Sequence, residues 1–341
     1  MKYKYIYTGL TRISDLADKK FEVLKIDKSF WDTGDYVICK IITKGSDTFK
    51  LELPNGRMRG VMGGESLVGV LGERHATLEA TGTWKAAKPD GMLHVLTAGG
   101  LLGKLTSKSI YIHELTEIQY IGHAFRSEKK ITMDDFLKPV KQIEFKTPVV
   151  LFVGTSMSAG KTTSARIVTN IFKMAGLKVV GAKLTGAGRY KDILALKDVG
   201  ADAVFDFVDA GLPSSICPRD VYLEKVNYMK NLISSVDADV AVIEIGASPL
   251  EPYNGDLAIE AIREQIKCII LSASDPYAVF GLMKAFDIVP NVVTGVSTNT
   301  LGGRELVEKL CGVVALNLID PKTTPMLKNI LSKSFGFDLK F

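Results

Sequence analysis

The sequence predicts an α/β protein in which a mostly parallel sheet carries helices on both faces and is preceded by a smaller β-rich domain. Before Pro148, short segments rich in β-branched residues are separated by turn sequences, which is typical of hairpins. After Pro148, continuous apolar segments alternate with amphipathic stretches, which is typical of a parallel sheet covered on both sides. This change of pattern predicts a β-rich domain over residues 1–147, with a linker near 127–147, and an α/β domain over 148–341.

The composition is that of a globular protein, because 46% of the 341 residues are hydrophobic and 24% are charged. The stretch MKYKYIYTGLTRISDLADKK lacks the apolar core and cleavage site of a secretory signal, and no apolar run approaches the roughly 18 residues of a membrane helix. The four cysteines form no CxxC pair, so we expect free thiols instead of a disulfide or zinc framework. We therefore expect a cytoplasmic protein with no membrane partner.

The formal net charge of +5 comes entirely from the first part of the chain. Residues 1–146 contain 23 Lys and Arg against 18 Asp and Glu, whereas residues 147–341 contain 20 of each. Such an excess could favour an anionic ligand, although solvated surface lysines are its commoner cause. No basic run with interleaved aromatic residues is present, so the sequence does not favour nucleic-acid binding.

The β-rich part is predicted to form hairpins or a small barrel. Its clearest strands are DYVICKIIT, FKLELP and SLVGVLG, and the sequences TGD, PNG and GG supply turns. The stretch LTAGGLLGKLTSKS, residues 96–109, could bind an anion, but a hairpin with exposed lysines is the favoured interpretation. All four histidines lie in this part, and their spacing fits no zinc pattern.

The α/β part contains six apolar segments that we interpret as strands: 149–154, 178–183, 239–246, 267–274, 292–297 and 312–317. Amphipathic helices are predicted over 162–176 and 220–236. The carboxyl ends of parallel strands usually form the ligand site of such a sheet. The stretch FDFVDAGLPSS places Asp206 and Asp209 in a turn that could lie over this site, although loop carboxylates are usually just solvated.

The turn between the first apolar segment and its helix, GTSMSAGKTT, predicts a phosphate-binding loop. Backbone N–H groups of such a loop converge on an anion, and the following helix adds partial positive charge. Lys161 would reach the β- and γ-phosphates of a nucleotide, and the Thr162 hydroxyl would bind Mg²⁺. The less favoured interpretation is a glycine turn with a surface lysine. The residues expected to bind the nucleotide are Gly154, Thr155, Ser158, Ala159, Gly160, Lys161, Thr162 and Thr163.

This loop is one residue longer than the usual GxxxxGK[ST] pattern, and it resembles GTxTxxGKT, the loop of dethiobiotin synthetase. Four later stretches resemble that family in the same order: AKLTGAG, KDILALK, VIEIGASPLEPYNG and TGVSTNT. The resemblance covers about residues 149–320 and implies a P-loop NTPase-type fold. It places family site residues at Lys183, Asp192, Glu244 and Asn299.

The resemblance implies that Thr162, Asp192 and Glu244 hold Mg²⁺ and that Asn299 reads the adenine of ATP. From the residues alone, Asp192 could equally be an exposed carboxylate at the start of a helix. Glu244 ends a buried apolar strand, where an unpaired acid is rarely found. Lys183 could bind the transferring phosphate or an anionic substrate, or it could simply extend from its strand end to solvent.

Two departures separate the chain from dethiobiotin synthetase itself. Ser156 replaces an acidic loop residue of that family, and Ala247 and Ser248 replace the glycine pair that follows the glutamate. The surroundings of both metal and substrate have therefore changed. We expect a member of the dethiobiotin-synthetase-like P-loop family with an added N-terminal β-rich domain, and a homodimer by that family's habit.

The predicted function is that of an ATP-dependent ligase-type enzyme, which phosphorylates a carboxylate or carbamate so that an amine or other nucleophile displaces the phosphate. Lys161, Lys183 and Mg²⁺ would neutralise the developing charge. The second substrate is an unidentified small molecule, which could be anionic. The alternative is a nucleotide-binding adaptor, like the GTP-binding accessory proteins of molybdopterin dinucleotide synthesis. ATP is favoured over GTP because Asn299 is not followed by the Lys-x-Asp of many GTP-binding proteins.

Overall fold

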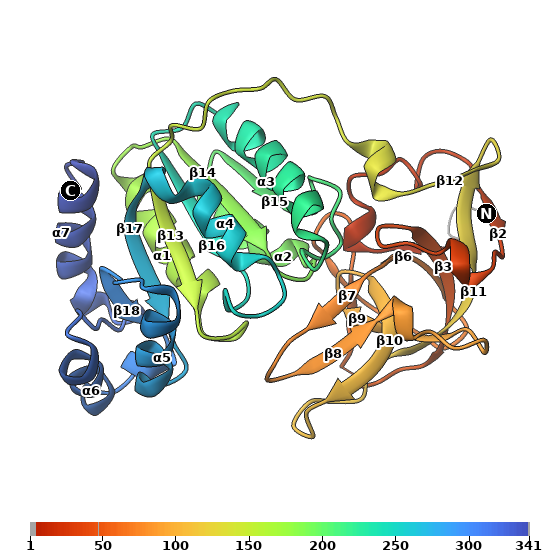
Figure 1. The fold of residues 1–341 in the computed structure, drawn as a ribbon, viewed down its shortest axis with the longest axis horizontal. Coiled ribbons are helices and arrows are strands. Elements are labelled where there is room, and N and C mark those ends of the chain that lie inside the picture. The colour runs from red at the N-terminus through yellow and green to blue at the C-terminus, as the bar shows by residue number, and fades with distance from the viewer. Residues whose placement is uncertain (1–4, 47, 340–341) are drawn as a thin grey trace. The chain divides into compact units, whose positions relative to one another are not determined.

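The computed structural model describes residues 5–46 and 48–339 (Figure 1). The chain folds into two compact units. Unit 1 contains the described residues up to Pro139 together with 187–191 and 207–225, and unit 2 contains Val140–Gly186, Asp192–Asp206 and the described residues from Val226 onward. Two helices carry residues of both units: α2, Tyr190–Lys197, and α3, Arg219–Ser234.

Unit 1 is built around a closed five-stranded barrel. Strand β3 pairs antiparallel with β6 and β11, β9 pairs antiparallel with β10 and β11, and β10 pairs parallel with β6, so the pairings return to the starting strand. Of the two arrangements left open by the sequence, the chain forms the barrel. The strands of this unit are β1 Ile6–Tyr7, β2 Glu22–Leu24, β3 Tyr36–Thr43, β4 Lys50–Glu52, β5 Met58–Gly60, β6 Ser66–Leu71, β7 Glu73–His75, β8 Ala80–Thr83, β9 Met92–Thr97, β10 Leu101–Lys108, β11 Glu117–Arg126 and β12 Lys129–Lys130.

The barrel core is formed by alternate side chains of its strands. Val37, Cys39 and Ile41 of β3 are buried in one cluster with Leu93 and Val95 of β9. Successive side chains of a strand point to opposite faces, so this spacing of two directs every second residue inward. The β-branched residues of these segments therefore form strands because their apolar face is covered.

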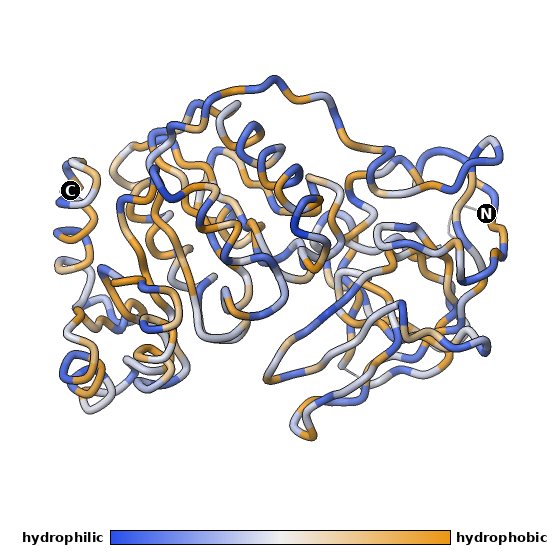
Figure 2. The backbone as a smooth tube through the Cα atoms, viewed as in Figure 1, coloured by the Kyte–Doolittle hydropathy of each residue, from blue (hydrophilic) through white to orange (hydrophobic). Residues whose placement is uncertain are grey.

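Unit 2 contains a six-stranded sheet in which every pairing is parallel. The strand order is β15-β14-β16-β13-β17-β18. All residues of β13, β14 and β16 are buried, and Figure 2 shows these central strands mostly in the hydrophobic colour. Their bounds are β13 Val149–Gly154, β14 Val179–Thr185, β15 Ala203–Asp206, β16 Val240–Ile245, β17 Ile266–Ser272 and β18 Val292–Thr294.

Helices cover both faces of this sheet (Figure 1). A right-handed connection from β13 to β14 places α1 on one face, whereas the connection from β16 to β17 runs the other way and places α4 on the opposite face. The connections that follow the neighbouring strands β13 and β16 therefore leave in opposite directions along the sheet. Open α/β sheets usually bind ligands at the carboxyl ends of two such strands. The remaining helix bounds are α1 Lys161–Met174, α4 Gly255–Ile262, α5 Pro276–Phe286, α6 Leu301–Cys311 and α7 Thr324–Phe335.

The predicted fold class is confirmed, with two differences in the strands of unit 2. Residues 312–317 form no strand, because they meet β18 only through one parallel bridge between Val293 and Ala315, and β18 itself is three residues long. Conversely, β15 was not predicted. Its four residues lie at the sheet edge, and Asp206 interrupts the apolar pattern there.

The stretch 96–109 contributes to the β9–β10 hairpin, as expected, but its lysines Lys104 and Lys108 are half-buried instead of exposed, and Lys108 pairs with Glu114 at 2.9 Å. All four cysteines are free thiols. Among residues 5–46 and 48–339, no helix combines the length and apolarity needed to cross a membrane.

Candidate functional site

The predicted phosphate loop lies between β13 and α1, as residues 155–160. Gly160 precedes the helix with a φ of +102°, a conformation that glycine adopts without strain. Gly154 is required for a different reason, because a Cβ there would lie 2.8 Å from Cδ of Lys161. The lysine therefore folds back across the end of β13, and the loop is shaped by its own glycines.

Lys161 is buried, with 1% of its surface exposed, so it is not the surface lysine of the less favoured interpretation. Its Nζ donates a hydrogen bond to the backbone oxygen of Ser156 at 2.7 Å. Burial lowers the pKa of Lys161 to about 8, and the Glu244 carboxylate only partly offsets this effect. A buried ammonium at the mouth of a small-residue loop is well placed to pair with an anion.

Thr162 and Glu244 meet where β13 and β16 end. The Thr162 hydroxyl donates to Oε2 of Glu244 at 3.0 Å, and Glu244 is 4% exposed. Thr162 is the second residue of α1 and Glu244 is the next-to-last residue of β16, so their contact lies at the carboxyl ends of two neighbouring strands.

Lys183 is a second buried lysine near the carboxyl ends of the parallel strands. Its Nζ lies 2.7 Å from Oδ2 of Asp192 and 3.8 Å from Oε1 of Glu244. Burial alone would lower the pKa of Lys183, but these two carboxylates outweigh burial and raise the pKa above the ordinary lysine value. Lys183 thus does not extend to solvent, and Asp192, in the first turn of α2, is not simply an exposed helix-start carboxylate.

The donor set fits a magnesium ion bound mainly by phosphates and water. In an octahedron with Mg–O distances of about 2.1 Å, neighbouring ligands are about 3.0 Å apart, and Thr162 Oγ1 and Glu244 Oε2 have that separation. Asp192 is linked to Glu244 by Lys183, which contacts both carboxylates, and the acidic side chains do not form a metal-binding cluster on their own. The described residues contain no group of three or more His, Cys, Asp or Glu that could hold a metal by itself.

Asn299 lies outside this cluster, on a turn that contacts the loop. The side chain is exposed, directly after the 3₁₀ turn Val296–Thr298. Gly295, which precedes that turn, approaches the loop so closely that a Cβ would lie 2.4 Å from the backbone oxygen of Ala159. The turn after β18 is therefore brought to the phosphate loop, while a contact of Asn299 with a nucleotide base stays a prediction.

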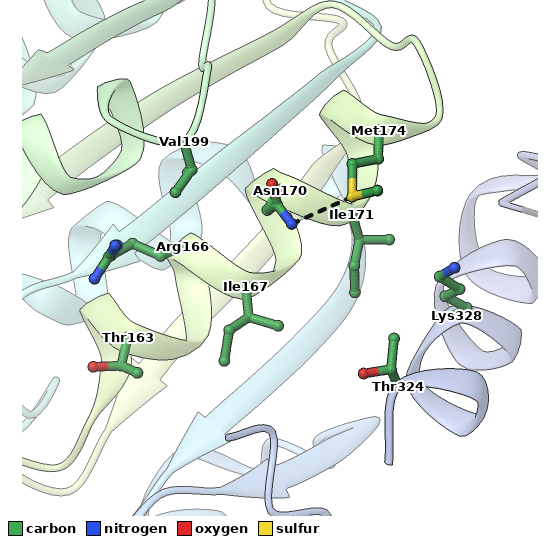
Figure 3. A pocket seen from close by; sticks show the side chains of 9 residues that line it. All are labelled: Thr163, Arg166, Ile167, Asn170, Ile171, Met174, Val199, Thr324 and Lys328. Atoms are coloured by element: carbon green, nitrogen blue, oxygen red, sulfur yellow. Dashed lines mark hydrogen bonds between the residues drawn. The ribbon is translucent and has the colours of Figure 1, made fainter. Parts of the chain in front are cut away.

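The remaining loop residues face different surroundings. Ala159 is buried, Thr155 is half-buried with its hydroxyl 3.4 Å from that of Ser274, and Ser158 is exposed. Thr163 is exposed and lines a groove of about 490 Å³ between α1 and α7, together with Arg166 and Lys328 (Figure 3). This groove contains none of the other predicted nucleotide-binding residues.

Two buried acidic residues near the site, Asp206 and Glu251, were not predicted as site residues. Asp206 is 2% exposed at the end of β15, beside Lys183 in the sheet register, so it is not a solvated loop carboxylate. Its charge contributes to raising the pKa of Lys183. Glu251 is 7% exposed, accepts from the Ser248 backbone N–H at 2.7 Å, and its charge opposes the lowering of the pKa of Lys161. No strand pattern pointed to Asp206, because the short strand β15 that it ends was not predicted.

No protein-family model matches this sequence, and no curated protein matches it. Similar solved structures include the signal recognition particle receptor FtsY from Elizabethkingia anophelis in complex with GDP, with 21% identity over 52% of this chain and 58% of that chain and a TM-score of 0.35. A DUF1611 family protein from Anabaena variabilis has 13% identity over 57% of this chain and 61% of that chain, with a TM-score of 0.39. HypB from Helicobacter pylori in complex with nickel has 16% identity over 56% of this chain and 88% of that chain, with a TM-score of 0.37.

The chain spans less than two thirds of the FtsY and DUF1611 structures that it resembles. Unit 2 nevertheless has a P-loop NTPase-type fold, on the grounds of its own parallel sheet, its strand–loop–helix and the lysine that folds back over the loop.

Proposed function

We propose that the protein binds MgATP and is an ATP-dependent ligase-type enzyme. The observation that carries the proposal is the placement of Glu244 between two lysines: it accepts from Thr162, lies 3.8 Å from Lys183 and acts electrostatically on Lys161. One buried carboxylate thus joins the phosphate loop to a second cation. This is the arrangement expected where phosphoryl charge is both held and transferred.

Nucleotide binding follows from the loop residues. Lys161 would exchange the Ser156 carbonyl for a phosphate oxygen, a stronger partner because it is charged. Mg²⁺, when bound, would neutralise phosphate charge, and Thr162 and Glu244 would hold it directly or through water. The start of α1 would add its partial positive charge.

In the ligase-type reaction, Lys183 would contact the substrate group that accepts the γ-phosphate. A carboxylate or carbamate oxygen would attack the γ-phosphorus, ADP would leave, and an amine would then displace the phosphate. Lys183 is held by Asp192 and Glu244 and stays charged, so it could stabilise negative charge on the transferring group. The second substrate is proposed to be a small carboxylate or carbamate.

A thermal-shift series tests nucleotide binding. MgATP at about 100 times its dissociation constant should stabilise the fold by roughly 2.7 kcal/mol, and Lys161→Ala should remove most of this gain. Lys173→Ala is the matched control, because Lys173 lies in the last turn of the same helix and pairs with Asp202. No shift of the wild type with any Mg-nucleotide would refute the proposal.

A phosphate-release screen of small carboxylates and amines separates the ligase from a GTP-binding adaptor. Lys183→Ala should keep MgATP affinity within a few-fold and lower substrate-stimulated turnover by on the order of 10², the scale for losing one electrostatic stabiliser. Stimulation that survives in Lys183→Ala would contradict the role of this lysine. Larger stabilisation by GTP than by ATP, with no stimulated release, would favour the adaptor.

We also propose that the protein is a homodimer, on the family resemblance of the loop and its following motifs. Analytical ultracentrifugation at micromolar concentration checks this directly. A monomer under those conditions would remove the proposal without affecting nucleotide binding.

A further inference from the structure

Helix α2 has no capping side chain in its own preceding sequence. The residues before it are GAGR, 186–189, and none of them is the Ser, Thr, Asp or Asn that usually accepts the first N–H groups of a helix. Those N–H groups still need partners, because an unpaired backbone donor away from water is unfavourable. The cap of α2 must therefore come from another part of the chain.

Glu52, the last residue of β4, supplies this cap. Its Oε1 accepts from the Tyr190 N–H at 2.6 Å, and its Oε2 accepts from the Lys191 N–H at 3.1 Å. Glu52 is fully buried, at 0% exposure, and all three residues belong to unit 1. A buried carboxylate needs such donors, and a negative charge at a helix start also interacts favourably with the helix dipole.

The surroundings of Glu52 fix both the carboxylate and the turn that it caps. A Cβ at Gly9 would lie 2.5 Å from Oε1 of Glu52, so glycine is required for the carboxylate to fit. In the turn before α2, Gly188 accepts from the Thr97 hydroxyl at 2.9 Å and donates its N–H to Pro213 at 2.9 Å. The start of α2 is thus held by four hydrogen bonds within unit 1.

Asp192 follows Lys191 directly in the chain and is the third residue of α2. Its carboxylate pairs with Lys183 at 2.7 Å. We propose that Glu52 is a positioning residue of the Mg-nucleotide site: by capping α2, it fixes the place of Asp192 and, through it, that of Lys183. The inference rests on the proposed function, because the site that Glu52 would position is the one proposed there.

Amide hydrogen exchange of the full-length protein tests the cap without any ligand. Glu52→Gln should speed exchange of peptides covering 187–197 by about tenfold, the effect expected for losing one helix cap. Glu65→Gln is the matched control, because Glu65 is a carboxylate of the same unit that accepts from the Met62 N–H at 2.8 Å and pairs with Arg59. Equal exchange of 187–197 in wild type and Glu52→Gln would overturn the cap.

A Mg²⁺ titration of nucleotide binding tests the positioning role. Glu52→Gln should raise the Mg²⁺ concentration at half-maximal binding by about tenfold and leave affinity in EDTA within about twofold, since the cap positions Asp192, which is a predicted ligand of the metal. Glu65→Gln should change neither. An unchanged Mg²⁺ midpoint, or equal losses with and without the metal, would overturn the positioning role, because a merely structural defect would not be selective.

Two further variants guard against misfolding. Glu52→Asp keeps the charge but is one methylene shorter, so it should show an intermediate Mg²⁺ midpoint. Arg189→Asp, added to Glu52→Gln, places a local capping residue before α2 and should restore the midpoint at least in part. Failure of the wild type itself to bind nucleotide with Mg²⁺ would overturn the proposed function and the positioning role together, whereas the exchange result would still decide whether Glu52 caps α2.

Discussion

The pKa values of Lys161 and Lys183 are shifted in opposite directions although both side chains are buried at one sheet edge. Burial lowers both pKa values, but Lys183 has the Asp192 carboxylate at 2.7 Å, whereas Lys161 donates to the neutral backbone carbonyl of Ser156. The partner therefore decides the sign of the shift. Lys183 therefore stays charged at neutral pH, whereas Lys161, with a pKa of about 8, loses its proton just above neutral pH.

This difference predicts a pH dependence of nucleotide binding. Because the pKa of Lys161 is about 8, its proton is lost as the pH rises above that value, and the dissociation constant of MgATP should rise by up to about tenfold per pH unit. For stability the sign is opposite. The folded protein loses this proton above about pH 8, whereas the unfolded chain keeps it up to the ordinary pKa of 10.5, so the contribution of Lys161 makes the free energy of unfolding rise with pH between these two values.

Titration with a fluorescent ATP analogue between pH 7.5 and 9.5 is the measurement. Lys161→Arg, which cannot lose its proton in this range, should bind with a flat profile. A wild-type profile as flat as that of Lys161→Arg would show that Lys161 does not titrate here.

The metal hypothesis makes a second residue-scale prediction. Asp192→Asn and Glu244→Gln should each weaken nucleotide binding in Mg²⁺ by about tenfold or more and have little effect in EDTA, because each replaces an anionic oxygen by a neutral one. Asp198→Asn, at an exposed position just after α2, serves as the control. Calorimetry in the two buffers checks this, and equal losses in both would point to misfolding and against metal coordination.

At the scale of the elements, close approach between turns shapes the site as much as the strands do. Gly295 adopts φ +90° and ψ −158°, a region essentially restricted to glycine, where the turn after β18 meets the phosphate loop. Its absent side chain leaves room for the backbone oxygen of Ala159. The loop is thus supported from a strand that lies two places away from β13 in the sheet.

Gly295→Ala should therefore destabilise the protein by about 2–4 kcal/mol, from the strained backbone and the contact with Ala159, and should weaken nucleotide binding. Gly312→Ala is the matched control: its φ is also positive, at +67°, but nothing lies within 4 Å of the added Cβ. The control should cost about 1 kcal/mol and leave nucleotide affinity unchanged. Denaturant unfolding and nucleotide titration measure the two effects, and equal behaviour of the variants would contradict the packing role of Gly295.

At the scale of the whole molecule, unit 1 contains a polar network that is separate from the nucleotide site. This network consists of the buried residues Tyr120, His123 and Asp35. The Tyr120 hydroxyl lies 2.7 Å from Nδ1 of His123, and Nε2 of His123 lies 3.1 Å from Oδ2 of Asp35. Lys130 pairs with the same Asp35 oxygen at 2.8 Å. The Asp35 carboxylate can only accept, so Nε2 of His123 donates to it, and Nδ1 of the same ring faces the Tyr120 hydroxyl. Burial raises the pKa of Tyr120 to about 12, so the hydroxyl stays protonated.

Tyr120→Phe should lower the free energy of unfolding by about 1–3 kcal/mol, because it leaves Nδ1 of buried His123 without its hydrogen-bond partner. Nucleotide affinity should stay within about twofold, since neither residue belongs to the phosphate loop. Tyr111→Phe, at a side chain that is 92% exposed, should be neutral. Chemical denaturation followed by circular dichroism decides, and equal stability of both variants would mean that the polar network contributes nothing.

The sequence by itself determined the features that depend on neighbouring residues. Apolar runs of strand length, helical periodicity and the small residues around Lys161 predicted the parallel sheet, most of its strands and the loop, because strand and helix periods and glycine conformations are local properties. The family resemblance added Lys183, Asp192, Glu244 and Asn299, and the first three lie together in the structure. Their roles toward metal and nucleotide stay predictions.

Only the tertiary structure decided how distant segments pair. The parallel β6–β10 contact closes the barrel, and a register between β14 and β15 buries Asp206 beside Lys183. Glu52 caps a helix that begins 138 residues later. Such contacts depend on chain segments far apart in sequence, so no local period reports them, and a carboxylate such as Glu52 looks in sequence like any charged residue at the end of a strand.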